Sequence, residues 1–476
     1  MNKQEDSRQT AKAALFNTIA NVIALVVGMV MVPVITRVIS AEDLGIASTF
    51  LSTRNILVIV VTLAVYAYVN RAMLEYKDNK KDYVFTLVGF CIVTVIISFL
   101  VCLPWKEGIQ KILSMDDFLF YWLFVSMFSI ALYNIGYNYC AFHNKYMIVS
   151  TIVLMTGPAA QVLALVLSYV MPKHKYIGRV IGLDFVYMIV TVCVLIWMVV
   201  GRKGHFQKEY LKHTLTFTVP IIPHMLSQMV LTQCDLIMIN YFSGGEKAGI
   251  YSMAHTIGYL AFTVMTQIMA IWSPWVYRRL EEKDYTYVYQ NANMIMLIAS
   301  YITMGLLTVA PELIKIFLTK EYLPCIYIVP PLVVGMFFQI MYMFFYDVEY
   351  YYKKAKAIAI FSVISCLVNV GLNYVLIPKF GYMAASYTTV VSYLLLMLLS
   401  GAYALKLGGA KIYNLKYMFA ANAAVTAYAV MAVVWTEQVI LRYGILVALT
   451  GILLIKEYDK IKAFLVSMKG GKRENT

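Results

Sequence analysis

Hydrophobic residues fill long, nearly uninterrupted runs from one end of the chain to the other, and short polar turns separate the runs. Each run has about 20 residues, enough for a helix to cross a hydrocarbon core of about 30 Å. The pattern therefore predicts an all-α polytopic membrane protein.

About fourteen transmembrane helices are predicted from these runs, as two sets of six followed by a C-terminal pair. The two sets define an N-lobe over 1–204 and a C-lobe over 205–406. The remaining segment, 407–476, holds the last two helices and a basic cytoplasmic tail. The predicted spans are 14–39, 45–70, 83–104, 117–142, 147–171, 177–200, 215–242, 248–272, 288–310, 324–349, 357–377, 382–405, 413–434 and 438–456.

The end of one apolar run and the start of the next recur at about half the chain length. Asp235 to Gly258 ends a run, makes a short polar turn and restarts at Gly249. Roughly 204 residues earlier, Val34 to Phe50 does the same and restarts at Gly45. A unit repeated at this spacing predicts two related bundles, which in membrane transporters enclose the substrate path.

Composition argues against several other classes of protein. The chain is 61% hydrophobic and 13% charged, whereas soluble proteins have about 25% charged residues. Its net charge of +14 is spread over alternate loops, which is not the distribution of a nucleic-acid surface. The seven cysteines are scattered without a CxxC pair, so neither a metal nor a cofactor is expected. The longest outer loops, 105–116 and 311–323, have about a dozen residues each, too few for a catalytic domain, and an enzyme is not expected.

The distribution of lysine and arginine predicts the orientation. With the N-terminus inside, the inner segments hold 27 basic residues and the outer loops hold 11. Short loops rich in Lys and Arg remain on the cytoplasmic side of a membrane. Both termini are therefore expected in the cytoplasm.

Arg54 is the clearest candidate for chemistry inside the membrane. It lies nine residues beyond Gly45, which places it about 13 Å into the second span, near the membrane centre. A guanidinium at that depth must face protein or a water-filled cavity, where it can bind an anion such as phosphate through two hydrogen bonds. The alternative is a structural role, as the partner of a buried carboxylate or of backbone carbonyls.

Asp235 and His255 lie on the consecutive predicted spans seven and eight. Asp235 is the candidate for a coupling ion, with pairing to a cation or a structural hydrogen-bond network as the alternatives. His255 lies at about the depth of Arg54, so the repeat predicts that both face one cavity; a structural histidine is the alternative. Tyr251 and Tyr259 are candidates for stacking on sugars, with packing as the alternative.

Other ionisable residues in the spans have structural interpretations. Arg179 and Asp184 lie five residues apart in the sixth span, which favours a structural ion pair. Asp347 and Glu349 end the tenth span and are followed by lysines, so their carboxylates are expected to reach the membrane interface.

Several motifs keep their order and spacing over nearly the whole chain. They are Asp235-Leu236-Ile237-Met238 leading to Gly249-Ile250-Tyr251, Ile271-Trp272-Ser273-Pro274, and Ile377-Pro378-Lys379-Phe380-Gly381. Together with the span pattern, they resemble the polysaccharide transporter branch of the MOP flippase superfamily. The resemblance implies two six-helix lobes in a V around a central cavity that opens alternately to each side.

The resemblance also implies a location, the cytoplasmic membrane of a bacterium, and a function. Members of this branch translocate undecaprenyl-diphosphate-linked oligosaccharide repeat units across the cytoplasmic membrane for O-antigen, capsule or exopolysaccharide assembly. Flippases of the superfamily use a cationic cavity for the lipid diphosphate, and Arg54 is the candidate match. The implied partners are the lipid-linked substrate, membrane lipids, a coupling H⁺ or Na⁺ and other polysaccharide assembly proteins, without nucleic acid.

Three alternative functions rank below this one. The lipid II flippase of the same superfamily, which acts in peptidoglycan synthesis, also has fourteen spans. MATE-type drug/cation antiporters usually have twelve, so the additional C-terminal pair counts against them. A membrane glycan polymerase or ligase would need a large outer loop with catalytic polar residues, which this sequence does not offer.

Overall fold

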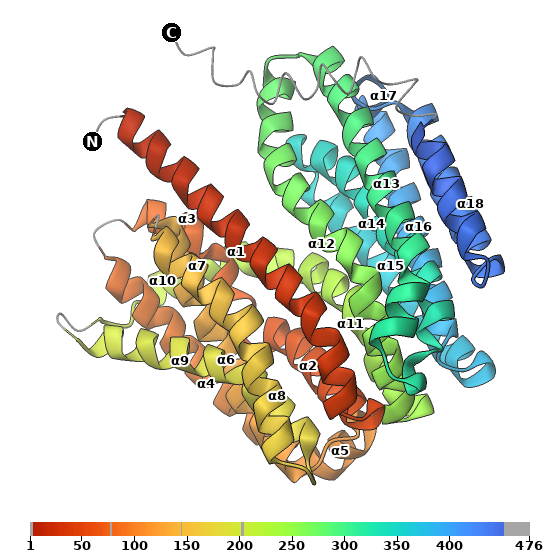
Figure 1. The fold of residues 1–476 in the computed structure, drawn as a ribbon. Helices are drawn as coiled ribbons and strands as arrows, with labels where there is room; N and C mark the ends of the chain where they lie inside the picture. The colour runs from red at the N-terminus through yellow and green to blue at the C-terminus, as the bar shows by residue number, and fades with distance from the viewer. Residues whose placement is uncertain (1–2, 77–78, 144, 201–203, 452–476) are drawn as a thin grey trace. The chain divides into compact units, whose positions relative to one another are not determined.

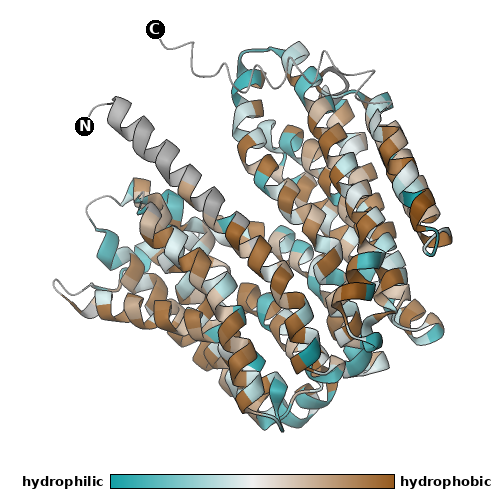
Figure 2. Ribbon diagram, viewed as in Figure 1, coloured by the Kyte–Doolittle hydropathy of each residue, from teal (hydrophilic) through white to brown (hydrophobic). Residues whose placement is uncertain are grey.

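A computed structural model describes residues 3–76, 79–143, 145–200 and 204–451 (Figure 1). Within these residues the chain forms helices and turns and no β-strand. Twelve helices are long and apolar enough to cross a membrane, and shorter apolar helices cover Val26–Val38 and Val439–Gly451. Hydrophobic residues dominate the helices, and hydrophilic ones gather at helix ends and turns (Figure 2). The predicted all-α polytopic fold is confirmed.

The chain divides into two compact units. The division does not follow the predicted end of the N-lobe at residue 204, so the predicted lobes and the compact units are different partitions of the chain. The predicted basic tail lies in 452–476, outside the described residues. Unit 1 comprises Met1–Ser252, Phe317–Tyr322 and Val370–Tyr382; unit 2 comprises Met253–Ile316, Leu323–Asn369 and Met383–Thr476.

Unit 1 contains the helices from α1 to α11, the first turns of α12 and the end of α15. Its core is a continuous cluster of buried side chains contributed mainly by α4, α6 and the segment 64–73, with further side chains from α2. The helix bounds are α1 Lys3–Val38, α2 Ala41–Val61, α3 Val69–Glu75, α4 Lys80–Cys102, α5 Lys106–Leu113, α6 Asp117–Phe142, α7 Tyr146–Leu154, α8 Ala160–Val170, α9 Lys175–Val199, α10 Lys208–Thr218 and α11 Ile222–Ser243.

Unit 2 is built around α14, of whose span 94% is buried. This helix packs against α16 and α18. Its almost uniformly apolar sequence fits a helix covered on every side by other helices. The helix bounds are α12 Gly245–Glu281, α13 Tyr285–Phe317, α14 Cys325–Tyr351, α15 Ala355–Phe380, α16 Ala384–Lys406, α17 Gly409–Ile412 and α18 Leu415–Val434.

Most predicted spans coincide with helices to within a few residues, and the fourth has the same limits as α6. The second span differs, because α2 ends at Val61 and does not continue to residue 70. Leu63 and Ala64 adopt φ angles of 48° and 49°, and a 3₁₀ turn over Val65–Tyr68 follows. Such angles are uncommon for residues other than glycine. No glycine or proline marks this break, so the sequence gives no signal for it.

The two copies of the repeated turn pack against each other within unit 1. A Cβ on Gly45 would lie 1.8 Å from the carbonyl oxygen of Gly245, and a Cβ on Gly249 would lie 1.8 Å from that of Ala41. These two contacts are equivalent, because each residue has a counterpart 204 positions away in the other contact. The two stretches are therefore related by a local pseudo-two-fold axis, like the two sides of an isologous interface.

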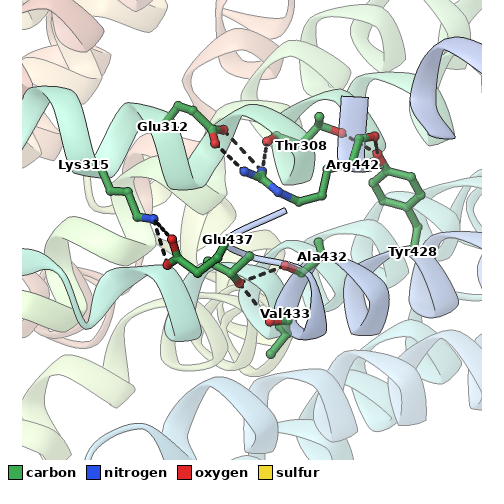
Figure 3. A network of polar contacts seen from close by, with 9 residues as sticks. Thr308, Glu312, Lys315, Tyr428, Ala432, Val433, Glu437 and Arg442 are labelled. Atoms are coloured by element: carbon green, nitrogen blue, oxygen red, sulfur yellow. Dashed lines mark hydrogen bonds and ion pairs between the residues drawn. The ribbon is translucent and has the colours of Figure 1, made fainter. Parts of the chain in front are cut away.

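In unit 2 a buried arginine ties the helix Val439–Gly451 to α13 (Figure 3). Arg442 is fully buried, and its guanidinium donates to the Glu312 carboxylate and to the carbonyl of Thr308. The Tyr428 hydroxyl, on α18, lies 2.5 Å from Thr308 Oγ1. A buried charge persists only with such partners, so this network holds three helices together.

Candidate functional site

Arg54 lies in the second half of α2 and is buried, with 4% of its surface exposed. Its Nη1 donates to the carboxylate of Asp184 on α9 and lies 3.4 Å from the Ser126 hydroxyl on α6. Nη2 donates to the side chain of Asn55 at 3.0 Å. The guanidinium carbon lies 5.4 Å from the centroid of the Tyr187 ring. Side chains from three helices of unit 1 thus surround this cation.

Asp184 is fully buried and accepts hydrogen bonds on both carboxylate oxygens. Arg54 donates to one oxygen, and the indole Nε1 of Trp122 on α6 donates to the other at 2.9 Å. Two buried charges remain stable only while they are paired, because their attraction offsets the loss of hydration. Two roles were predicted for Arg54, anion binding and a structural ion pair. In this conformation Arg54 has the structural role, as the partner of a buried carboxylate.

The partner of Asp184 is Arg54 and not Arg179, with which it was predicted to pair. Five residues along an α-helix correspond to a rotation of about 140°, so Arg179 and Asp184 leave α9 in different directions. Arg179 is itself 9% exposed, and its Nε and Nη1 atoms are buried without a hydrogen-bond partner. The sequence pattern missed this second buried guanidinium, because a local pair accounted for its charge.

Asp235 lies on α11 and is also buried. The Tyr251 hydroxyl, on α12, donates to Oδ2 at 2.7 Å, and Asn373 Nδ2, on α15, donates to Oδ1 at 2.7 Å. All three residues belong to unit 1. Tyr251 has no exposed surface, so its hydroxyl serves the carboxylate in this conformation. Its predicted contact with sugar stays a prediction.

Polar side chains connect α2 with α11 and α12 in unit 1. The Ser52 hydroxyl donates to Gln233 Oε1 on α11 at 2.7 Å. The hydroxyls of Ser48 and Ser252, which are 204 positions apart, lie 2.7 Å from each other. Hydrogen bonds between membrane helices help to fix their packing. These two hydrogen bonds therefore link α2, which carries Arg54, to α11 and α12, which carry Asp235 and Tyr251.

His255 belongs to unit 2 and stacks on Tyr259, with ring centroids 5.2 Å apart and an interplanar angle of 20°. Its Nε2 atom is buried without a hydrogen-bond partner. A buried polar atom without a partner costs about 1–3 kcal/mol, which makes this nitrogen a candidate contact for a bound molecule. The predicted convergence of His255 and Arg54 on one cavity stays a prediction, because the two residues lie in different units.

Asp347 and Glu349 on α14 were predicted to reach the membrane interface, but both carboxylates are buried. Asp347 is 1% exposed and accepts hydrogen bonds from Ser273 at 3.1 Å and Tyr277 at 2.8 Å. Glu349 has no exposed surface; its Oε1 accepts from Ser400 at 2.7 Å, and its Oε2 has no partner. The lysines that follow suggested an interface, but surrounding helices of unit 2 enclose this end of α14.

The sequence model of a family described as polysaccharide biosynthesis protein matches residues 10–278, more than half of the chain. The chain belongs to this family. The matched region includes Arg54, Asp184 and Asp235. No curated protein matches the chain.

Solved structures with the same fold are transporters. The lipid II flippase MurJ in an inward closed conformation matches with a TM-score of 0.69 and 15% identity over 94% of this chain and 99% of that chain. An inward-facing multidrug resistance MATE family transporter gives 0.64 and 13%, over 83% and 98%. A MOP superfamily transporter from Pyrococcus furiosus gives 0.53 and 14%, over 84% and 96%. This member of the polysaccharide biosynthesis family therefore has the fold of MOP superfamily transporters.

Proposed function

We propose that the chain is a flippase that moves undecaprenyl-diphosphate-linked oligosaccharide repeat units across the cytoplasmic membrane by alternating access. One observation carries the proposal: a member of the polysaccharide biosynthesis family matches the fold of a lipid II flippase over 94% of its length. The family description names polysaccharide synthesis, and the matched structure is named for a lipid substrate; a glycan carried on a lipid combines the two. The MATE transporter matches over a smaller share, 83%, which favours the lipid-linked substrate over a drug.

In this proposal Arg54 breaks its ion pair with Asp184 and binds the diphosphate of the substrate instead. The planar guanidinium presents paired N–H donors that fit phosphate oxygens. When Arg54 turns to the diphosphate, Asp184 keeps the hydrogen bond from Trp122, which is 2.9 Å long in this conformation. The carboxylate therefore retains a donor after the cation has left. Return of Arg54 to Asp184 would release the substrate.

Asp235 is the proposed site of the coupling ion, either H⁺ or Na⁺. Its carboxylate is buried in an apolar helix, where an ionisable group marks an ion pathway more often than elsewhere. Tyr251 and Asn373 both donate to it, so binding of a proton or a sodium ion would change the hydrogen bonds that join three helices. The gradient would then act on the same unit that contains Arg54.

Export of polysaccharide tests the role of Arg54, in a strain that assembles the repeat unit but lacks its own flippase. Arg54→Ala is expected to abolish surface polysaccharide, and Arg54→Lys to reduce it strongly, because lysine lacks the paired donors of arginine. The matched control is Arg37→Ala, at an exposed position in the last turn of α1, which should export like the wild type. Immunoblotting measures membrane abundance in parallel.

A second variant separates loss of function from loss of folding. Arg54→Ala alone leaves Asp184 as a buried charge without a cation, a penalty of about 3–5 kcal/mol. The double variant Arg54→Ala/Asp184→Asn removes both charges, and its amide oxygen can still accept from Trp122. It should accumulate in the membrane without exporting polysaccharide. Export at the wild-type level by the double variant would overturn the proposed role of Arg54.

Transport of lipid II is the second candidate function. The full-length match to MurJ, which covers 99% of that chain, supports it. The two functions separate by complementation: a repeat-unit flippase restores surface polysaccharide to a strain lacking that activity, whereas a lipid II flippase restores growth to a strain depleted of its own. We expect rescue of the polysaccharide and not of growth, and the reverse result would replace the first proposal by the second.

A further inference from the structure

An apolar groove of about 450 Å³ lies among α6, α7 and α9 in unit 1. Within this unit, α6 contacts both of the other helices (Figure 1). These helices belong to spans long and apolar enough to cross a membrane. The lining residues Ile148 and Ile189 are 47% and 39% exposed, so the groove opens on the surface of unit 1 at the depth of the hydrocarbon core. Its walls are mainly aliphatic, and they include Ile135, Ile148, Ile152, Met155, Val190 and Val194.

One end of the groove is aromatic and basic. The rings of Tyr139 and Trp197, which both line the groove, have centroids 5.1 Å apart. The ammonium of Lys145, the charged residue of the lining, lies 5.8 Å from the Tyr139 ring centroid. The ammonium of Lys81 lies 5.2 Å from the Trp197 ring centroid. Two cations thus flank the pair of rings at this end.

A third lysine adds to the positive charge. Lys80 Nζ lies 2.8 Å from His143 Nε2, and the His143 ring lies 4.4 Å from the Tyr139 ring. The neighbouring carboxylate of Asp82 is 5% exposed and accepts a hydrogen bond from the backbone of His205 at 2.9 Å. The carboxylate is therefore buried, whereas Lys145 is exposed and Lys80 and Lys81 are half-buried. The Lys81 ammonium also donates to the carbonyl of Val200.

This basic end coincides with the ends of the membrane helices. Phe142 ends α6, Tyr146 begins α7 and Val199 ends α9. Aromatic side chains at such positions lie at the level of lipid headgroups, and basic pockets between membrane helices bind anionic headgroups. The aliphatic part of the groove, around Ile135 and Met155, lies deeper along the same helices.

We propose that this groove binds one anionic phospholipid of the surrounding membrane. An acyl chain fills the aliphatic part, the glycerol region contacts Tyr139 and Trp197, and the phosphate is bound by Lys145 with Lys81 beside it. The site is separate from the proposed substrate contact. Asp184 and Tyr187, which contact Arg54, do not line the groove, whereas Val190, Cys193 and Trp197 further along α9 do.

Native mass spectrometry of the purified full-length protein tests the proposal, with phosphatidylglycerol and phosphatidylcholine as probes. The wild type should retain one phosphatidylglycerol molecule in preference to phosphatidylcholine. Lys145→Glu changes the local charge by two units, each worth ~1 kcal/mol near an anionic headgroup. It should weaken phosphatidylglycerol binding about thirty-fold, since 1.4 kcal/mol is tenfold, and leave phosphatidylcholine unaffected.

Two more variants locate the site. Lys208→Glu reverses an exposed charge that does not line the groove and should bind phosphatidylglycerol like the wild type. Thr151→Trp places a large ring in the groove from an exposed position of its lining and should abolish the tight site. Equal affinity for the two lipids in the wild type would overturn the proposal. Equal retention of phosphatidylglycerol by the wild type, Lys145→Glu and Thr151→Trp would overturn it as well.

Discussion

Among single residues, buried charges carry most of the information about this protein. Arg54 and Asp184 form one buried pair, and Arg442 with Glu312 forms another. An ionisable group between membrane helices is expensive without a partner, so the pattern of hydrophobic runs already singles out Arg54. Arg179 differs, because two atoms of its buried guanidinium have no hydrogen-bond partner.

Glu75, at the end of α3, illustrates a charge outside the membrane-spanning helices. The Tyr68 hydroxyl donates to its Oε2 at 2.6 Å, and Arg71 Nε donates to its Oε1 at 3.0 Å. The hydrogen bond from Tyr68, with that from Arg71, holds the pKa of Glu75 below its ordinary value of 4.5. A carboxyl with a lowered folded-state pKa stabilises the fold above its ordinary pKa, and this contribution disappears as the pH falls through the lowered value.

Acid unfolding tests this contact. The unfolding temperature of the wild type in detergent should fall as the pH is lowered below 4.5, the ordinary pKa of a glutamate, in part because Glu75 becomes protonated. Glu75→Gln should show a smaller decrease over the same pH range, because an amide does not titrate there. Glu246→Gln, at an exposed position, serves as the control and should keep the wild-type slope. Identical slopes for the wild type and Glu75→Gln would contradict the assignment.

Among helices, the close approach of α2 and α12 depends on the two repeated glycines. The Cβ of an alanine at Gly45 or Gly249 would lie 1.8 Å from a backbone carbonyl oxygen, a contact that only a backbone shift can relieve. Gly45→Ala and Gly249→Ala should therefore each destabilise the protein by about 1–3 kcal/mol, the usual cost of overpacking. Thermal unfolding in detergent measures the loss.

Gly305→Ala is the matched control for both glycines. Gly305 lies inside α13, and a Cβ there would meet nothing within 4 Å. Alanine is favoured over glycine in a helix by about 1 kcal/mol, so this variant should unfold at the wild-type temperature or above it. Equal unfolding temperatures for Gly45→Ala and Gly305→Ala would show that α2 and α12 do not approach each other as closely as described.

For the protein as a whole, coupling to an ion gradient is the property that the Asp235 network would control. In Asp235→Asn the amide oxygen can accept from Asn373 and the amide nitrogen can donate to the Tyr251 hydroxyl, so the helices should stay in contact. The charge and the titratable carboxyl group are lost, and transport should no longer respond to the gradient. Flipping of lipid-linked oligosaccharide in proteoliposomes with an imposed proton or sodium gradient measures this response.

Asp117→Asn provides the comparison for the gradient experiment. Asp117 is the first residue of α6. Its side chain is 75% exposed and forms an ion pair with Lys106. This variant should respond to the gradient like the wild type. An unchanged response in Asp235→Asn would remove Asp235 from the coupling mechanism and leave it a structural role.

The sequence by itself determined the helical architecture, because a hydrocarbon core sets the length of every helix that crosses it. The fourth predicted span and α6 have identical limits, 117–142, and the repeated turns at Gly45 and Gly249 were recognised from residue order alone. Apolar run length and turn chemistry are local properties of the chain. They remain readable without any knowledge of neighbouring helices.

The tertiary structure alone decided which polar groups meet. Arg54 pairs with Asp184, 130 positions away, and Asp235 accepts from Asn373, 138 positions away, whereas the sequence had favoured a partner for Asp184 only five residues distant. Asp347 is likewise buried by helices that its sequence neighbours do not reveal. A membrane helix is apolar on nearly every side, so its periodicity does not indicate which face packs against another helix. Partners therefore depend on helix rotation and crossing, which arise only when the chain is folded.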